Sequence, residues 1–148
     1  MIITRISAGM GNQMFMYAAG LAVASRLGTE LKLDTQGFSS ESFRKYSLDI
    51  FPNITEKSAS FREIWSIAPF QAVAGRFRIR GNSIFRHPFR RLLYESMRIA
   101  GLLETMKPEN VPFSRIYYPP DFAFHEEFNR IQNNTYIIGY WESEKFFA

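Results

Sequence analysis

The residues best suited to binding chemistry form a short segment near the amino terminus: Gly9, Met10, Gly11, Asn12 and Gln13. Two glycines let backbone N–H groups approach a ligand closely, and a helix that starts here presents partial positive charge. Phosphate or pyrophosphate is the ligand that such a turn favours. The amide side chains add hydrogen-bond donors for phosphate or sugar oxygens. The alternative is a tight turn whose glycines serve backbone geometry alone.

Two common nucleotide-binding motifs fit this turn poorly. The dinucleotide fingerprint G-x-G-x-x-G needs a third glycine, where this chain has Met14. Asp34 does follow at the end of the next predicted strand, where a ribose-binding acid would stand. A Walker A loop is absent, because the chain has no Gly-Lys-Ser/Thr sequence. A Rossmann-type oxidoreductase domain therefore stays open as a weakly supported alternative.

The composition argues against metal and disulfide chemistry. The chain has no Cys, which excludes disulfides and Cys-ligated metal centres. Its two histidines, His87 and His125, lie too far apart in the sequence to indicate a metal site, and we expect His125 on the surface. The composition therefore indicates no Cys-ligated or His-based metal site. With 148 residues, 46% of them hydrophobic, the chain is long and apolar enough for a folded core.

Positive charge is concentrated in one segment. Between Arg76 and Arg98 lie seven arginines and one acid, Glu95, whereas the whole chain carries +4. Such a strip can contact nucleic acid, anionic lipid or a phosphorylated ligand, or it can be a solvated helix face. A basic module that binds nucleic acid or a membrane surface is thus the second alternative. Our preferred interpretation has no nucleic-acid partner and allows peripheral membrane contact through this strip.

No segment is expected to be a signal peptide or a membrane span. Residues 6–25 carry no charge, but Gly9, Gly11, Asn12 and Gln13 interrupt the apolar run at a cost that a membrane helix would not tolerate. We expect a cytoplasmic protein, with any membrane contact peripheral and at the inner face.

The elements that must position the glycine segment form a βαβ unit. Residues 1–6 predict a buried parallel strand, and residues 7–12 a turn. Residues 13–27 predict a helix that is buried on all sides, ending at Gly28 as a helix-terminating residue. Residues 30–34 predict the second strand. The fold class is therefore α/β and Rossmann-like.

The remainder of the chain has a less regular pattern. One further strand is predicted at residues 135–140. Helical segments are expected at residues 57–74, 88–104 and 122–132, and residues 142–147 predict the start of another. Residues 43–54 are expected to form a short strand or an irregular segment packed by aromatic side chains, and the proline-rich residues 108–120 are expected to be extended.

Several segments resemble one enzyme family. Residues 7–20, which read S-A-G-M-G-N-Q-M-F-M-Y-A-A-G, resemble the opening of the family 11 glycosyltransferases, the α-1,2-fucosyltransferases, which usually reads G-G-L-G-N-Q-(M/L)-F-Q-Y-A. Leu27-Gly28 followed by Leu31-x-Leu33-Asp34 is similar to the family's second strand. Residues 43–51 resemble its R-x-Y-x-L-x-x-F stretch, and residues 135–147 its Gly-Tyr-Trp/Phe-Gln-Ser block.

The chain also departs from the family pattern. Ala8 replaces the first glycine, which matters if that position needs a positive φ. Met10 replaces Leu, Met16 replaces Gln, and Glu142 stands where Gln is common. The family's His-x-Arg-x-Gly-Asp-Tyr motif is missing. We therefore expect residues 1–148 to be the N-terminal part of a longer fucosyltransferase, truncated before its C-terminal donor-binding half and nearly inactive alone.

The resemblance implies an incomplete GT-B-type fold, in which two Rossmann-like domains face each other across a cleft. The implied reaction transfers L-fucose from GDP-fucose to the 2-hydroxyl of a terminal galactoside, with inversion and without a metal or any other cofactor. Residues 9–13 would then contact the donor, with Asn12 as the contacting side chain.

The end of the last predicted strand supplies the second group of candidate residues. Tyr140, Trp141 and Glu142 would lie in the substrate cleft, where a sugar could stack on Trp141; aromatic core packing is the alternative. No catalytic residue can be assigned. By motif position, Glu142 and Asp34 are the nearest candidates for a general base, and a structural role is the alternative for both.

Overall fold

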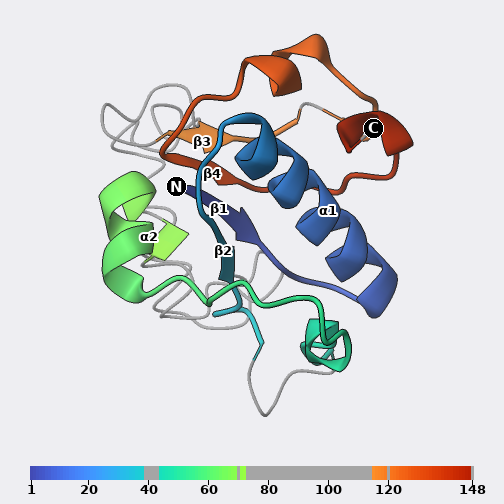
Figure 1. Ribbon diagram of the computed structural model, residues 1–148, viewed down its shortest axis with the longest axis vertical. Coiled ribbons are helices and arrows are strands. Elements are labelled where there is room, and N and C mark those ends of the chain that lie inside the picture. The colour runs from blue at the N-terminus through green and yellow to red at the C-terminus, as the bar shows by residue number, and fades with distance from the viewer. Residues whose placement is uncertain (39–43, 70, 73–114, 120, 148) are drawn as a thin grey trace, which may run out of the picture.

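The computed structural model describes residues 1–38, 44–69, 71–72, 115–119 and 121–147. The regular elements in chain order are β1 (Ile2–Arg5), α1 (Met10–Arg26), β2 (Leu31–Asp34), η1 (Leu48–Ile50), α2 (Phe61–Ile67), β3 (Ile116–Tyr117), η4 (Glu126–Arg130), β4 (Thr135–Ile137) and η5 (Glu144–Phe146), where η denotes a 3₁₀ helix. Figure 1 shows α1 and α2 flanking the strands.

A parallel sheet organises these elements. Its strand order is β2-β1-β4-β3, and all three neighbouring pairs run in the same direction. Ile2 is paired with Leu31 on one side and with Thr135 on the other, so β1 occupies the centre. The predicted α/β class with a βαβ start is confirmed: β1, α1 and β2 follow one another, and β1 pairs directly with β2.

The strand β3 was not anticipated from the sequence. Residues 108–120 were expected to be extended only, but Ile116 and Tyr117 pair with Tyr136 and Ile137 of β4. Two residues beside a proline-rich stretch carry too little pattern to predict a strand. β3 pairs with the edge of β4 that β1 does not use, and β4 follows only later in the chain.

Helix α1 begins three residues earlier than predicted, at Met10 rather than Gln13. Gly9 is its N-cap, and its last turn carries Arg26. The helix ends in a Schellman motif: Gly28 has φ +58° and donates to the Ser25 carbonyl, while Thr29 donates to the Ala24 carbonyl. The prediction that Gly28 terminates the helix is thus confirmed.

One side of α1 is exposed, which corrects the expectation of a helix buried all round. Met10, Met14, Phe15 and Leu21 are exposed, whereas Met16, Ala19, Gly20 and Val23 face the sheet. The apolar composition that suggested full burial includes several long side chains on the outer side. A run of apolar residues does not by itself specify which of them meet the core.

The short helix α2 covers the opposite face of the sheet. Ser60 caps it by accepting from the backbone N–H of Glu63, and the Glu63 carboxylate accepts from the Ser60 backbone in return. This capping box fixes the helix start at Phe61. The predicted helix over residues 57–74 is therefore wrong at its start, since Ser58 instead bridges to Leu33.

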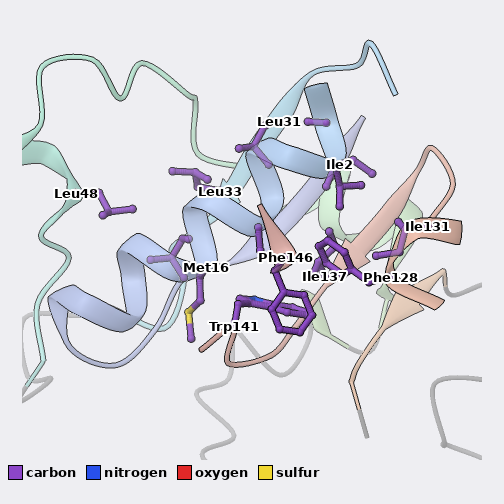
Figure 2. Packing of buried hydrophobic residues seen from close by; sticks show 14 residues of the cluster. Ile2, Met16, Leu31, Leu33, Leu48, Phe128, Ile131, Ile137, Trp141 and Phe146 are labelled. Carbon is purple, nitrogen blue, oxygen red and sulfur yellow. The ribbon is translucent and has the colours of Figure 1, made fainter. Parts of the chain in front are cut away.

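Two hydrophobic clusters lie on the two faces of the sheet. Figure 2 shows the larger one, in which Met16 of α1 packs with Leu33, Ile137, Trp141 and other residues. The smaller cluster joins Ile3 and Tyr136 of the sheet to α2. Alternate residues of a strand point to opposite faces, so Tyr136 and Ile137 enter different clusters.

The remaining predictions have mixed outcomes. The strand predicted at residues 135–140 ends at Ile137, because the chain bends at Gly139. The helices predicted at residues 122–132 and 142–147 are shorter 3₁₀ helices, η4 and η5. The helix expected at residues 88–104 and the arginine strip from Arg76 to Arg98 lie outside the described residues.

Candidate functional site

The carboxyl ends of the parallel strands gather the candidate residues at one edge of the sheet. β1 ends at Arg5 and leads into the glycine turn, β2 ends at Asp34, and β4 leads to Gly139 and Tyr140. Ligands of open parallel sheets bind at this edge, where the connections of neighbouring strands diverge. Both groups of residues selected from the sequence therefore lie at this edge of the sheet.

The amino terminus of α1 has the features of an anion-binding turn. Gln13 donates the first intrahelical hydrogen bond to Gly9 at 3.0 Å, so the N–H groups of Met10, Gly11 and Asn12 precede the helical ladder. No acidic residue occupies the first turn, and Gly9 provides no side-chain cap. These N–H groups and the helix dipole favour a negatively charged ligand.

The Gln13 side chain is buried and fully engaged with the backbone. Its Nε2 donates to the carbonyls of Ala8 at 3.0 Å and Lys45 at 2.8 Å, and its Oε1 accepts from the Ser47 N–H at 2.9 Å. Both amide hydrogens are used, so neither is left for a ligand. Gln13 thus positions the site by tying the segment around Lys45 to the glycine turn.

That tie brings Arg44 to the start of α1. A Cβ atom added to Gly9 would lie 3.4 Å from Arg44 Nη1, so the guanidinium sits directly against the N-cap. The guanidinium group of arginine is well suited to bidentate hydrogen bonding with phosphate oxygens. The sequence contained Arg44 within its R-x-Y-x-L stretch, but only the long-range bonds of Gln13 reveal that it joins residues 9–13.

Ala8 occupies a strained backbone position in this turn. Its φ is 63°, in the left-handed region that glycine adopts without penalty. The position at which the resembled family has its first glycine therefore does adopt a positive φ in this chain. Alanine holds this conformation at a cost of about 1–2 kcal/mol. The strain is local to the residue whose carbonyl receives the Gln13 amide.

A cavity of about 460 Å³ opens beside the turn at the same edge of the sheet. Ser7, which immediately precedes Ala8, lines it together with Met16 of α1. The other lining residues come from the ends of β1, β3 and β4: Arg5, Tyr118, Pro119, Asp121, Phe122, Ile138, Gly139 and Tyr140. A pocket of this size, lined by both aromatic and polar residues, is typical of small-ligand sites.

Gly139 is needed where the cavity meets the core. A Cβ atom there would lie 2.8 Å from Pro119 and 2.9 Å from the Trp141 ring. The absence of a side chain lets β4 turn out of the sheet between these two rings. Tyr140 is thereby directed outward while Trp141 is directed into the core.

Asp121, which lines the cavity, is paired with His125. His125 Nε2 donates to Asp121 Oδ1 at 2.7 Å, and the Ala123 N–H donates to the same oxygen at 2.8 Å. The hydrogen bond from His125, with that from Ala123, lowers the pKa of the Asp121 carboxyl. No sequence pattern indicated a contact between these residues, and His125 was expected only to lie at the surface.

The three residues predicted for the substrate cleft have different positions. Tyr140 is 41% exposed and lines the cavity. Trp141 is 1% exposed and packs between Phe128, Phe146 and Tyr117, so the geometry supports its core-packing alternative. Glu142 is exposed and is not a lining residue of the described cavity.

Asp34 is committed to structural hydrogen bonds. Its Oδ2 accepts from the Tyr136 hydroxyl, and its Oδ1 accepts from the Gln36 N–H at 3.0 Å. Burial, and then the negative charge of Asp34, raise the Tyr136 pKa well above its usual range. The carboxylate is buried, so a ribose or an acceptor hydroxyl would have to displace Tyr136 to reach it.

Within the described ranges, no group of three potential metal-ligating side chains is present. None of the helices in the described part of the chain combines the length and apolar character needed to cross a membrane. Comparison with models of protein families gives no match, and searches of curated proteins and of solved structures likewise give no significant match.

Proposed function

We propose that this chain is the N-terminal part of a GT-B-type glycosyltransferase that transfers L-fucose from GDP-fucose to the 2-hydroxyl of a terminal galactoside. The observation that carries the proposal is the turn at residues 9–13, where Gly9, the N-cap of α1, lies against the Arg44 guanidinium and the first helical turn holds no acidic residue. Such an arrangement suits the diphosphate of a nucleotide sugar. The family-like motifs that surround it supply the choice of donor.

The chemistry requires charge stabilisation at the departing GDP. Fucosyl transfer builds oxocarbenium character on the sugar and negative charge on the leaving diphosphate. Without a metal, hydrogen-bond donors and arginine must stabilise that charge. The N–H groups of residues 10–12 and the Arg44 guanidinium would supply this stabilisation, with Gln13 holding the two segments together and Asn12 offering a further side-chain donor.

The binding of NAD by an oxidoreductase domain is less consistent with this site. The acid that would hold the ribose, Asp34, already accepts hydrogen bonds from Tyr136 and Gln36. Releasing it would leave a buried tyrosine hydroxyl without its partner, at a cost of about 1–3 kcal/mol. The third glycine of the fingerprint is also replaced by the exposed Met14.

The proposal is tested by titrating the chain with GDP and with NAD, using calorimetry. We expect GDP to bind, and we expect Asn12→Ala and Arg44→Ala each to weaken GDP binding about tenfold, the loss of about one charge-assisted hydrogen bond. Thermal unfolding should change little. Met14→Ala, an exposed substitution one turn further along α1, is the matched control and should leave GDP affinity unchanged.

Two results would overturn the proposal. NAD binding without GDP binding would favour the oxidoreductase alternative. A loss of stability in Asn12→Ala that is as large as its loss of affinity would assign residues 9–13 a structural role alone.

A further inference from the structure

The side of α1 that faces away from the sheet is apolar and exposed. Met10 is 47% exposed, Met14 44% and Leu21 37%, and Phe15 is exposed as well. The single charged residue of the helix is Arg26, in its last turn. A surface helix ordinarily carries charged and polar residues on its solvent side. An outer side without charge, formed by several large apolar side chains, therefore indicates a contact surface.

The residues of this outer side repeat with the period of a helix that packs along another helix. At 3.6 residues per turn they form three rows, each with a spacing of seven: Gly11, Ala18 and Ser25 in the centre, Met14 and Leu21 on one flank, and Phe15 and Ala22 on the other. All of them are exposed or half-buried. Apolar residues repeated every seven positions form the contact stripe of paired helices. Small residues in the central row let two helix axes approach to about 8 Å. The stripe therefore suits another apolar helix.

A second copy of α1, running antiparallel, meets these requirements. A two-fold axis at Ala18 places this residue against Ala18 of the second copy, where two small side chains allow a close approach. The same axis places Met14 beside Leu21 of the second copy, so one apolar flank packs on itself. It places the large Phe15 ring beside the small Ala22 of the second copy. Because these rows hold no charged residue, the two-fold contact brings no like charges together.

We propose that this chain forms a homodimer through antiparallel contact between α1 and α1 of a second copy, with the two-fold axis at Ala18. The helix is about 25 Å long, at 1.5 Å per residue. A contact between two such helices belongs to the low end of interface sizes, below about 1,200 Å² in total, so the dimer is weak and reversible. The two glycine turns lie at opposite ends of the contact, and their N–H groups point along the helix axis. The dimer therefore leaves the candidate site open and does not depend on the proposed function.

The test is sedimentation velocity of the 148-residue chain at concentrations from about 1 μM to about 1 mM. We expect the parent chain to shift from monomer to dimer over this range. Ala18→Glu and Ala18→Lys should each weaken association by about tenfold or more, because each places two like charges at the axis. An equal mixture of the two variants should dimerise again, because opposite charges then meet. Ala18 lies on the outer side of α1, and Glu and Lys both favour helices, so circular dichroism should show folded variants.

The control variant is Trp65→Glu, which removes a half-exposed aromatic ring of α2 and adds the same charge away from α1. It should dimerise like the parent chain, whereas Leu21→Glu, on the flank of the stripe, should be monomeric. The inference is overturned by a parent chain that stays monomeric at about 1 mM, by a dimer that survives Ala18→Glu and Leu21→Glu, or by a mixture of the two Ala18 variants that stays monomeric. A monomer that binds phosphatidylcholine vesicles, and loses that binding in Leu21→Glu, would overturn it by assigning this side of α1 to a membrane surface.

Discussion

At the residue scale, Ala8 shows how a single side chain can strain a binding turn. Its positive φ costs about 1–2 kcal/mol, whereas glycine adopts it freely but loses more entropy on folding. We expect Ala8→Gly to raise the free energy of unfolding by about 1 kcal/mol, measured by urea denaturation. Ala18→Gly, inside α1, should lower it by about 1 kcal/mol. A destabilised Ala8→Gly variant would contradict the positive φ of Ala8.

At the element scale, the closeness of α1 to the sheet depends on Gly20. A Cβ atom there would lie 2.9 Å from Thr4 Cβ and 3.0 Å from Leu31 Cδ1. We expect Gly20→Ala to lower the free energy of unfolding by about 1–3 kcal/mol, because the helix must move away from the strands. Gly11→Ala is the matched control in the same helix, since nothing lies within 4 Å of its Cβ position. That variant should gain about 0.5–1 kcal/mol, and an equal response of the two would refute the close contact.

The attachment of α2 to β2 should depend on pH. The hydrogen bond from Lys32, with those from Ser60, lowers the pKa of Glu63 from 4.5 to about 2. A lowered folded-state pKa stabilises the fold above pH 4.5, and this contribution is lost as the pH falls from about 4.5 to 2.

Glu63→Gln isolates this contribution because glutamine can still complete the capping box. At pH 7 we expect the free energy of unfolding of the variant to be about 1 kcal/mol lower than that of the parent chain. The difference should shrink towards zero between pH 4.5 and pH 2 in thermal unfolding measurements. Glu30→Gln serves as the control, since the Glu30 side chain is exposed and its Oε1 lies 3.7 Å from Lys32 Nζ. A pH-independent difference at Glu63 would show that the ion pair does not contribute.

At the scale of the whole molecule, the sequence predicted the elements that depend on neighbouring residues. It did not predict the contacts between residues that are far apart in the chain. The pattern of strand, glycine turn and helix indicated the βαβ start, because hydrophobic periodicity and Gly28 act within a few residues. Local pattern did not predict that Gln13 would hold Arg44 against Gly9, or that Asp121 and Tyr140 would share a cavity. These contacts depend on strand order, which brings β1, β3 and β4 together.

The aromatic cluster after β4 tests whether the molecule unfolds as one unit. Phe146 is buried, and its ring centroid lies 5.0 Å from those of Trp141 and Phe128. This cluster is continuous with Ile2, Met16 and Leu31, so it belongs to the same core as β1 and α1.

We expect Phe146→Ala to lower the free energy of unfolding by about 3–5 kcal/mol, a large part of the 5–15 kcal/mol typical of a folded domain. Because the core is continuous, the loss should appear as one cooperative transition at lower temperature, with near-ultraviolet and far-ultraviolet circular dichroism changing together. Leu21→Ala, on the exposed side of α1, should shift that transition little. If the aromatic signal disappeared well before the helical signal, the residues after β4 would form a separately melting layer, and the cavity wall at Tyr140 would lack rigid support from the core.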